Sequence, residues 1–454
     1  MNSQNGDYRF LYTGIFSLNY FVQGINQSIF AVVIPVYLLE ILPTVDLGAL
    51  SFMLSFVLMP FILKIIYGIL SDKIKFKKIG RRKPWIIGPA SFSGLMWIMI
   101  AVLLTINPLS AMSIFTYAGF LTILGIAMAD TAMDGFILDI CPKNLLGRTT
   151  GTVWAVRSIG IIIGGPLILL ILLANIVDFK VVLIGLGITT IIFSFFSLKI
   201  RHKQYPERVP IIQNLKEMFK KAENWKVYFF SLFMAIVDGV IFVFLALFIL
   251  IKLGLIAAEG ATTSSLTSAF NLYPVQAFIA FLTGIGVFVG AILGGQVADK
   301  ISRRSSFIIR TLLTSGALAL LLIPLSAQFA WIYLIFAILV GSSSGWSNSA
   351  FSAISSQYAQ KYPQAPSTYF SVCTSFVNLG SQLGLIFTGM IFRTVSGITT
   401  SVLIIYAVVF LSMIILSNLA IIPFALLKRK NYEISLESGR TKEDLIKPSK
   451  LLKI

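Results

Sequence analysis

Charged side chains are scarce in this chain of 454 residues: they make up 12% of it, and there are a single histidine and two cysteines. Cys141 and Cys373 have no paired spacing, so neither a disulfide framework nor a metal site is expected. No GxxxxGK[ST] segment occurs, and ATP as the driving force is therefore not indicated. No nucleophile, base and orienting group lie at a recognisable spacing, so we expect no catalytic residues and no cofactor.

Long apolar runs are the main feature that is present, since 57% of the residues are hydrophobic. A run of about 20 residues crosses a hydrocarbon core of about 30 Å as a helix, which satisfies its own backbone groups. Twelve spans are predicted, at residues 10–42, 47–70, 85–106, 110–138, 150–176, 179–198, 226–252, 275–298, 306–326, 329–353, 368–392 and 398–427. The expected fold class is all-α integral membrane.

The one long hydrophilic interior segment separates six spans from six. It predicts an N-terminal six-helix bundle at 1–198, a cytoplasmic linker at 199–225, a C-terminal bundle at 226–427 and a cytoplasmic tail at 428–454. In the linker, Ile211, Leu215, Met218 and Phe219 recur at helical spacing among lysines, which predicts an amphipathic helix on the inner membrane surface. A solvated tether is the alternative.

The net charge of +18 falls on the C-terminal tail, the central linker and the loops of one side, while the outer loops sum to −1. This asymmetry follows the positive-inside rule and predicts a multi-pass protein of the cell membrane with both termini cytoplasmic. Anionic lipid of the bilayer, rather than nucleic acid, is the expected partner of the charge.

A charged segment occurs twice, each time at the end of an apolar run. It reads GILSDKIKFKKIGRR from Gly68 to Arg82 and GGQVADKISRR from Gly294 to Arg304, and its two aspartates lie 227 residues apart. With twelve spans and a central linker, it resembles the loop signature of the major facilitator superfamily. The resemblance implies two pseudo-symmetric six-helix bundles and an inner gate formed by Asp72, Arg81, Arg82, Asp299 and Arg304.

Two further segments resemble one group within that superfamily. PFILKIIYGILSD, from Pro60 to Asp72, and MADTAMDGFILDICPKNLLGRTTG, from Met128 to Gly151, are similar to the muropeptide permease, acetyl-coenzyme A transporter and folate-biopterin transporter group. GRRKPWI, from Gly80 to Ile86, instead resembles the sugar:cation symporters. The subfamily stays open between them.

Six charged residues fall inside predicted spans, where an ionised group on a lipid-exposed helix costs at least about 2.5–3.5 kcal/mol. They are Lys64, Asp130, Asp134, Arg157, Asp238 and Arg310. Helical rise places Lys64, Asp134 and Arg157 at a comparable depth, with Asp130 one turn further outward on the face of Asp134, which predicts a cluster of these four in the N-terminal half. The cluster is interpreted as a substrate and coupling site together with Asp238 of the other half; permanent salt bridges between helices are the alternative. Arg310 is expected near the inner interface.

Amides on two spans are candidates for substrate contact. Asn19, Gln23 and Asn26 share one face of span one, and Asn348 and Gln357 lie on the serine-rich span ten. Amides along one side of a membrane helix need partners, although packing explains them equally well on span ten. Glycines at Gly286, Gly290 and Gly294, four apart, predict close packing of span eight.

These features together predict a secondary active transporter that moves a small polar or anionic organic solute by alternating access. A co-transported proton or cation is expected, and since the one histidine, His202, lies in the linker, coupling would use the three acids within the spans. A sugar:cation symporter and a non-transporting assembly factor or sensor on the same fold are the alternatives. We expect a monomer.

Overall fold

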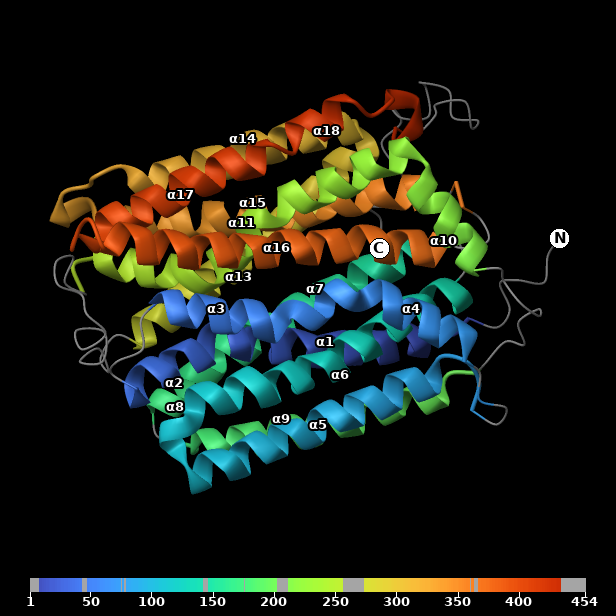
Figure 1. The fold of residues 1–454 in the computed structure, drawn as a ribbon, viewed down its shortest axis with the longest axis horizontal. Helices are drawn as coiled ribbons and strands as arrows, with labels where there is room; N and C mark the ends of the chain where they lie inside the picture. Colours follow the sequence, from blue (N-terminus) through green and yellow to red (C-terminus); the bar gives the residue numbers. More distant parts are fainter. Residues whose placement is uncertain are drawn as a thin grey trace, which may run out of the picture.

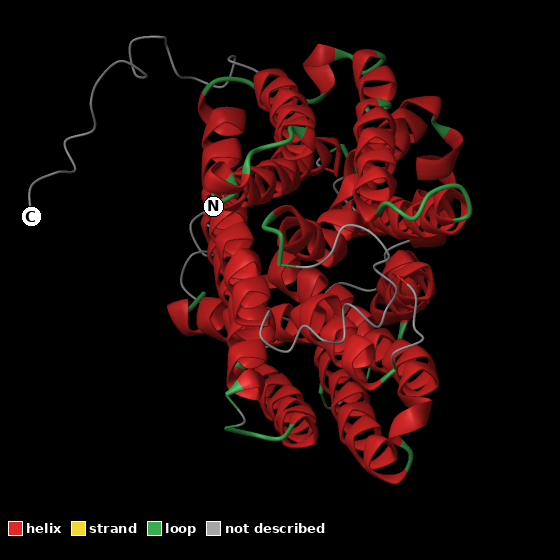
Figure 2. Ribbon diagram, turned by 90° about the vertical axis from the view of Figure 1, so that its left-hand side faces the viewer, coloured by secondary structure: helices red, strands yellow, loops and turns green. Residues whose placement is uncertain are grey.

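The computed structural model describes residues 8–42, 47–74, 76, 79–141, 146–174, 176–201, 211–255, 273–359, 361–362 and 366–433. Long helices run side by side along its longest axis, and helices joined by short loops account for most of the described chain (Figures 1 and 2). In Figure 1 the helices before residue 200 fill the lower half of the view and the later ones the upper half.

Six spans form the N-terminal half, and three of them contain a short irregular turn. They are α1 (Phe10–Ser28) with η1 (Ile29–Val33) and α2 (Ile34–Ile41); α3 (Leu47–Leu58) with η2 (Met59–Leu63) and α4 (Lys64–Lys73); α5 (Lys83–Ile106); η3 (Pro108–Ser110) with α6 (Ala111–Ile140); α7 (Leu146–Ile162) with η4 (Ile163–Leu167) and α8 (Ile168–Leu173); and α9 (Phe179–Phe195) with η5 (Phe196–Lys199).

The C-terminal half follows α10 (Ile211–Lys220). Its helices are α11 (Ala222–Lys252), α13 (Tyr273–Lys300), α14 (Arg303–Leu322), η7 (Ala327–Phe329), α15 (Ile332–Ala359), α16 (Pro366–Ser396), α17 (Val402–Asn418), α18 (Ile421–Ala425) and η8 (Arg429–Asn431). Within the described residues, eleven helices are long and apolar enough to cross a membrane. The serine-rich α15 is not among them, yet its 28 residues are long enough to span, and it packs beside α13 and α14 as the twelfth.

Proline positions one of the irregular turns beside the charged residues. Pro60 lacks an N–H and cannot continue regular α-helical bonding, and the chain around it forms the 3₁₀ turn η2. α4 begins immediately after this turn, at Lys64. The break therefore places Lys64 and the carbonyl groups of η2 at the middle of span two.

The buried apolar residues form three clusters. The largest crosses both halves and includes Phe30 and Leu54 of one and Phe244 and Tyr406 of the other. At the end of the molecule where α10 lies, which we call the linker end, the core divides into one cluster in each half. The halves therefore share a continuous core only toward the opposite end.

The linker helix α10 contacts protein where the sequence favoured lipid. Met218 is fully buried, and Leu215 and Phe219 pack against the linker-end core of the C-terminal half. The predicted close packing of the span-eight glycines is confirmed: a Cβ at Gly286 or Gly290 of α13 would collide with backbone of α15.

Candidate functional site

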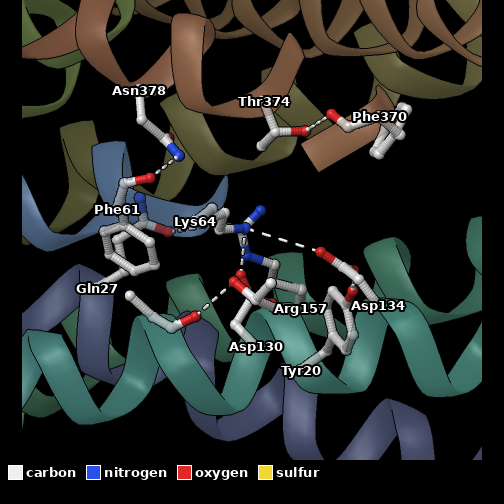
Figure 3. A network of polar contacts seen from close by, with 12 residues as sticks. Tyr20, Gln27, Phe61, Lys64, Asp130, Asp134, Arg157, Phe370, Thr374 and Asn378 are labelled. Atoms are coloured by element: carbon white, nitrogen blue, oxygen red, sulfur yellow. Dashed lines mark hydrogen bonds and ion pairs between the residues drawn. The ribbon is translucent and has the colours of Figure 1, made fainter. Parts of the chain in front are cut away.

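The four clustered charges of the N-terminal half meet in the structure as predicted. Lys64 forms an ion pair with Asp130 of α6, and its ammonium lies 3.8 Å from Asp134 one turn along the same helix (Figure 3). The side chains of Lys64 and Asp130 are only 8% and 4% exposed, whereas that of Asp134 is 25% exposed. The cluster thus has a buried ion pair and one more accessible acid.

Residues of α1 and α7 complete the cluster. The Tyr20 hydroxyl donates to Asp134, and Arg157 donates to the amide oxygen of Gln27 at 2.5 Å. The Arg157 guanidinium also lies 4.4 Å from the centre of the Trp154 ring, a cation–π contact. Within the described residues, the buried Nε of Arg157 has no hydrogen-bond partner. This donor is therefore without an acceptor in the part of the chain that the structure describes.

The cluster faces the other half of the molecule. Asn378 of α16 donates to the Phe61 carbonyl in η2 at 2.9 Å, and Thr374 one turn before it lies across from Lys64 (Figure 3). Closer to the end away from α10, Ser51 of α3 donates to the Leu385 carbonyl of α16 at 2.5 Å. The charges therefore lie where the two halves meet.

The polar face of span one has two different roles. Asn19 and Gln23 line a cavity of about 30 Å³ beside Tyr20 and Asp130, large enough for one or two waters, and the Gln23 oxygen has no partner among the described residues. Asn26 is fully buried and bonded to Val22, Thr190 and Trp97. Its expected substrate role is wrong, because packing between helices already satisfies its amide.

Asp238 of α11 belongs to a second polar group in the C-terminal half. Its carboxylate accepts from Ser344 of α15 at 3.2 Å. Arg310 of α14 lies beside it: its guanidinium donates to Ser347, one turn from Ser344, at 3.1 Å and to the Met234 carbonyl, one turn from Asp238. The prediction of an interfacial Arg310 is wrong, because the residue is fully buried within its bundle.

Asn348 is partly exposed on α15, and since it follows Ser347 directly, it points to an adjacent face of the helix. Gln357 is nearer the linker end, where its amide oxygen accepts from Arg303 at 2.9 Å. The latter contact makes Gln357 part of the linker-end structure rather than a substrate contact.

At the linker end of the N-terminal half, Arg81 and Arg82 both bond to Asp139 of α6, at 2.9 Å each. Arg82 is 2% exposed and also donates to Ser71 at 2.7 Å. These contacts join the loop after span two to the end of span four within the N-terminal half. The side chain of Asp72 lies outside the described residues.

The corresponding loop of the C-terminal half uses other groups. Arg303 is buried and donates to Gln357 and to the Tyr432 carbonyl, while the expected Arg304 is exposed. The Glu433 carboxylate accepts from the Ser302 hydroxyl and from the backbone N–H groups of Arg303 and Arg304, at 2.7–3.1 Å. The structure thus buries Arg303 where the sequence pointed to Arg304, and the side chain of Asp299 lies outside the described residues.

Hydrogen bonds lower the pKa of Glu433. Partial burial raises it, but the Ser302 hydroxyl and the two backbone N–H groups at the start of α14 stabilise the ionised form and outweigh burial. Glu433 follows the last span and bonds to the loop after span eight, so it holds the segment after α18 against the start of α14.

Comparison with known proteins agrees with this geometry. The family model described as Major Facilitator Superfamily matches residues 16–279 and 260–453. The chain belongs to the major facilitator superfamily. Comparison with curated protein sequences gave no match.

Solved structures of this superfamily share the fold at low identity. The nucleoside transporter NupG aligns with a TM-score of 0.63 at 13% identity, over 93% of this chain and 99% of the other. A D-xylose-proton symporter gives 0.62 at 14%, over 92% and 98%. An unoccupied, inward-facing bacterial homolog of the human lysosomal transporter Spinster gives 0.53 at 17%, over 92% and 94%.

Sequence reasoning missed several residues of this major facilitator protein. Tyr20 and Gln27 lie seven residues apart on α1, so they share one face of the helix. This spacing could have identified the pair alongside Asn19 and Gln23. Asp139 falls just beyond the predicted span 110–138, whereas in the structure α6 continues to Ile140 and includes it. Glu433 carries no signal in sequence for its contact with the start of α14, because Ser302, Arg303 and Arg304 are more than 100 residues away from it.

Proposed function

We propose that this major facilitator protein moves a small organic solute that carries an anionic group, and that a proton or cation moves with it. The observation that supports this most directly is the cluster of Lys64, Asp130, Asp134 and Arg157 between the two halves. Tyr20, Gln27 and the amide of Asn378 supply neutral hydrogen-bonding groups around it.

Charge balance supports coupling. The cluster has two cations and two acids and is neutral when all four are ionised. A bound monoanion would leave an excess negative charge in a site shielded from water, which is unfavourable unless a positive charge enters too. Asp134 is the group suited to take up a proton or contact a cation, because it is the more exposed acid and 3.8 Å from Lys64.

Arg157 is the group suited to bind the anion. Its cation is held by neutral Gln27 and Trp154, and its Nε is unpartnered among the described residues. A guanidinium presents donors in a planar fork that matches a carboxylate or phosphate. The solute is therefore proposed to bind between Arg157 and α16.

Alternating access is supported by the distribution of the core. The halves share one apolar cluster away from α10 but have separate clusters at the linker end. Two bundles that share their main apolar contact at one end, and meet at the other through α4 and α16, can rock about a midplane site. We assign the linker end to the cytoplasm because the excess of basic residues belongs there.

Transport by the full-length protein in proteoliposomes tests this proposal. A panel of anionic and neutral metabolites is first screened for counterflow, which needs no driving gradient, and solutes found are then tested for accumulation driven by a proton or sodium gradient. Asp134→Asn is expected to retain counterflow and lose gradient-driven accumulation, since the cluster with one acid fewer is neutral when an anion is bound.

Asp139→Asn on the same helix is the matched control, and it should slow both modes together because it belongs to the gate. Accumulation by Asp134→Asn against a gradient would contradict the coupling role. Transport of neutral solutes alone would favour a sugar:cation symporter and refute the charge-balance argument, and binding without flux would favour a sensor.

A further inference from the structure

The small cavity beside Asp130 lies inside the N-terminal half. Its volume is about 30 Å³, and its described lining residues all belong to α1, α5, α6 and α9. Lys64 binds Asp130 from span two, which contributes none of these lining residues (Figure 3). The cavity and the Lys64 ammonium therefore reach Asp130 from different parts of the bundle, and a ligand in the cavity does not have to displace Lys64.

Two buried acceptors at this cavity lack hydrogen-bond donors. Gln23 lines it and is 6% exposed, and its Oε1 has no partner among the described residues. Asp130 pairs with Lys64 but accepts no hydrogen bond from a neutral group in the part of the chain that the structure describes. Because burying an unpartnered acceptor is unfavourable, these oxygens favour a ligand that carries positive charge or donates hydrogen bonds.

Two further residues supply oxygens to the lining. Asn19 uses its Nδ2 as a donor to backbone carbonyls of α1 and α9, at 2.9 and 3.5 Å, so its Oδ1 remains an acceptor. The Thr190 hydroxyl donates to the Leu186 carbonyl at 2.8 Å and accepts from Asn26 at 3.3 Å, which leaves it one lone pair. A carboxylate together with amide and hydroxyl oxygens is the set of ligands that hard cations prefer.

Size and charge select a small monovalent cation. A volume of about 30 Å³ holds about two water-sized bodies, which is room for one ion and one water that completes its coordination. A divalent ion usually takes several carboxylates or keeps several waters, and the described lining has the Asp130 carboxylate alone. Potassium is larger and prefers more ligands than this lining offers. Sodium is the common cation that fits.

We infer that this cavity binds one sodium ion. Its ligands are Asn19, Gln23, Asp130 and Thr190. The link to transport rests on the proposed function: sodium adds the positive charge that the neutral cluster needs when it binds an anion. A cation on the cavity side of Asp130 also weakens the attraction between Asp130 and Lys64, and the Lys64 ammonium can then turn to Asp134, 3.8 Å away, or to the solute.

Binding of radioactive sodium to the purified full-length protein, with no solute present, tests this inference. The wild type is expected to bind sodium saturably, and unlabelled sodium should compete at concentrations at which potassium and choline do not. Sodium should also raise the unfolding midpoint by several degrees once its concentration exceeds Kd about a hundredfold, because it binds the folded state alone.

Two pairs of variants locate the site. Gln23→Leu removes the unpartnered oxygen and should weaken sodium binding about tenfold or more. Gln382→Leu is its control and should retain binding, because Gln382 of α16 is also 6% exposed with an unpartnered Oε1 among the described residues but does not line the cavity. Thr190→Val removes the hydroxyl and should weaken binding, whereas Thr190→Ser keeps it and should retain binding. The Thr190 pair provides the test if Gln23→Leu does not fold.

The outcomes separate this inference from the proposed function. No sodium binding by the wild type, equal competition by potassium, or unchanged binding in Thr190→Val and in a folded Gln23→Leu would overturn the sodium site and leave the cavity to water. Sodium binding without anion transport would support the site and refute the proposed function. Proton-driven anion transport by a protein that binds no sodium would do the reverse.

Discussion

The ion pair of Lys64 and Asp130 provides the sharpest test of the cluster. Both residues are more than nine-tenths buried. Replacing Lys64 with methionine removes the cation paired with Asp130 and leaves two acids in the same site. Breaking a buried pair from one side costs about 3–5 kcal/mol of unfolding free energy, because the remaining charge stays buried without a partner.

The geometry predicts an order among the variants. Asp130→Asn leaves Lys64 3.8 Å from Asp134, so this variant should lose less stability than Lys64→Met. The double variant removes both members of the buried pair and should lose far less than the sum of the single losses. For a cooperative unit of about 150–250 residues, 3 kcal/mol corresponds to a midpoint lower by roughly 6–12 °C.

Thermal unfolding in detergent, followed with a thiol-reactive fluorogenic dye, measures these differences. The two cysteines suit the method because both are buried, Cys373 fully and Cys141 at 8% exposure. A coupling between the two substitutions that exceeds the additivity error of about 0.3–0.5 kcal/mol confirms the pair. Additive effects, or a Lys64→Met midpoint equal to that of wild type, would refute the reasoning.

Three further predictions concern the gate and the helix packing. The pKa of Glu433 is lowered in the folded state, so its stabilising contribution is present above the ordinary glutamate pKa of 4.5 and is lost as the pH falls through the lower folded value. Acidification should therefore lower the unfolding midpoint of Glu433→Gln less than that of wild type. Parallel pH profiles of the two proteins would contradict this. Gly290→Ala puts a Cβ against the Ser342 carbonyl and should lower the free energy of unfolding by about 1–3 kcal/mol. Gly316→Ala, at an open helical position, should instead raise it by about 0.5–1 kcal/mol. Equal unfolding midpoints for these two variants would show that the contact at Gly290 is not tight. Asp139→Asn removes the carboxylate charge that pairs with both Arg81 and Arg82 and should lower the unfolding midpoint by several degrees, which the same dye assay checks.

Much of the fold followed from residue order. The length of the apolar runs predicted twelve spans, and even the serine-rich α15 is a full-length helix. The depth of Lys64, Asp130 and Asp134 followed from their distance along the chain to the ends of their helices, and their cluster is confirmed. Helical rise is constant, and for this reason counting residues placed these three charges at compatible depths.

Counting residues along the chain does not reveal which groups these charges contact. Helical periodicity defines a face only relative to its own helix, while the rotation of each helix against its neighbours is decided by packing, for example where Gly24 of α1 brings its backbone against Arg157 of α7. That rotation turned Asn26 into the bundle and Gln27 toward Arg157.

The sequence by itself determined a membrane protein of two six-helix halves, the depth of its buried charges and its superfamily, because these depend on composition, run length and a local motif. Only the tertiary structure decided that Arg303 and not Arg304 is buried at the linker end, that Arg310 lies beside Asp238, and that Glu433 bonds to the start of α14. These contacts join residues that are dozens to more than a hundred positions apart, and only helix packing brings them within hydrogen-bonding distance.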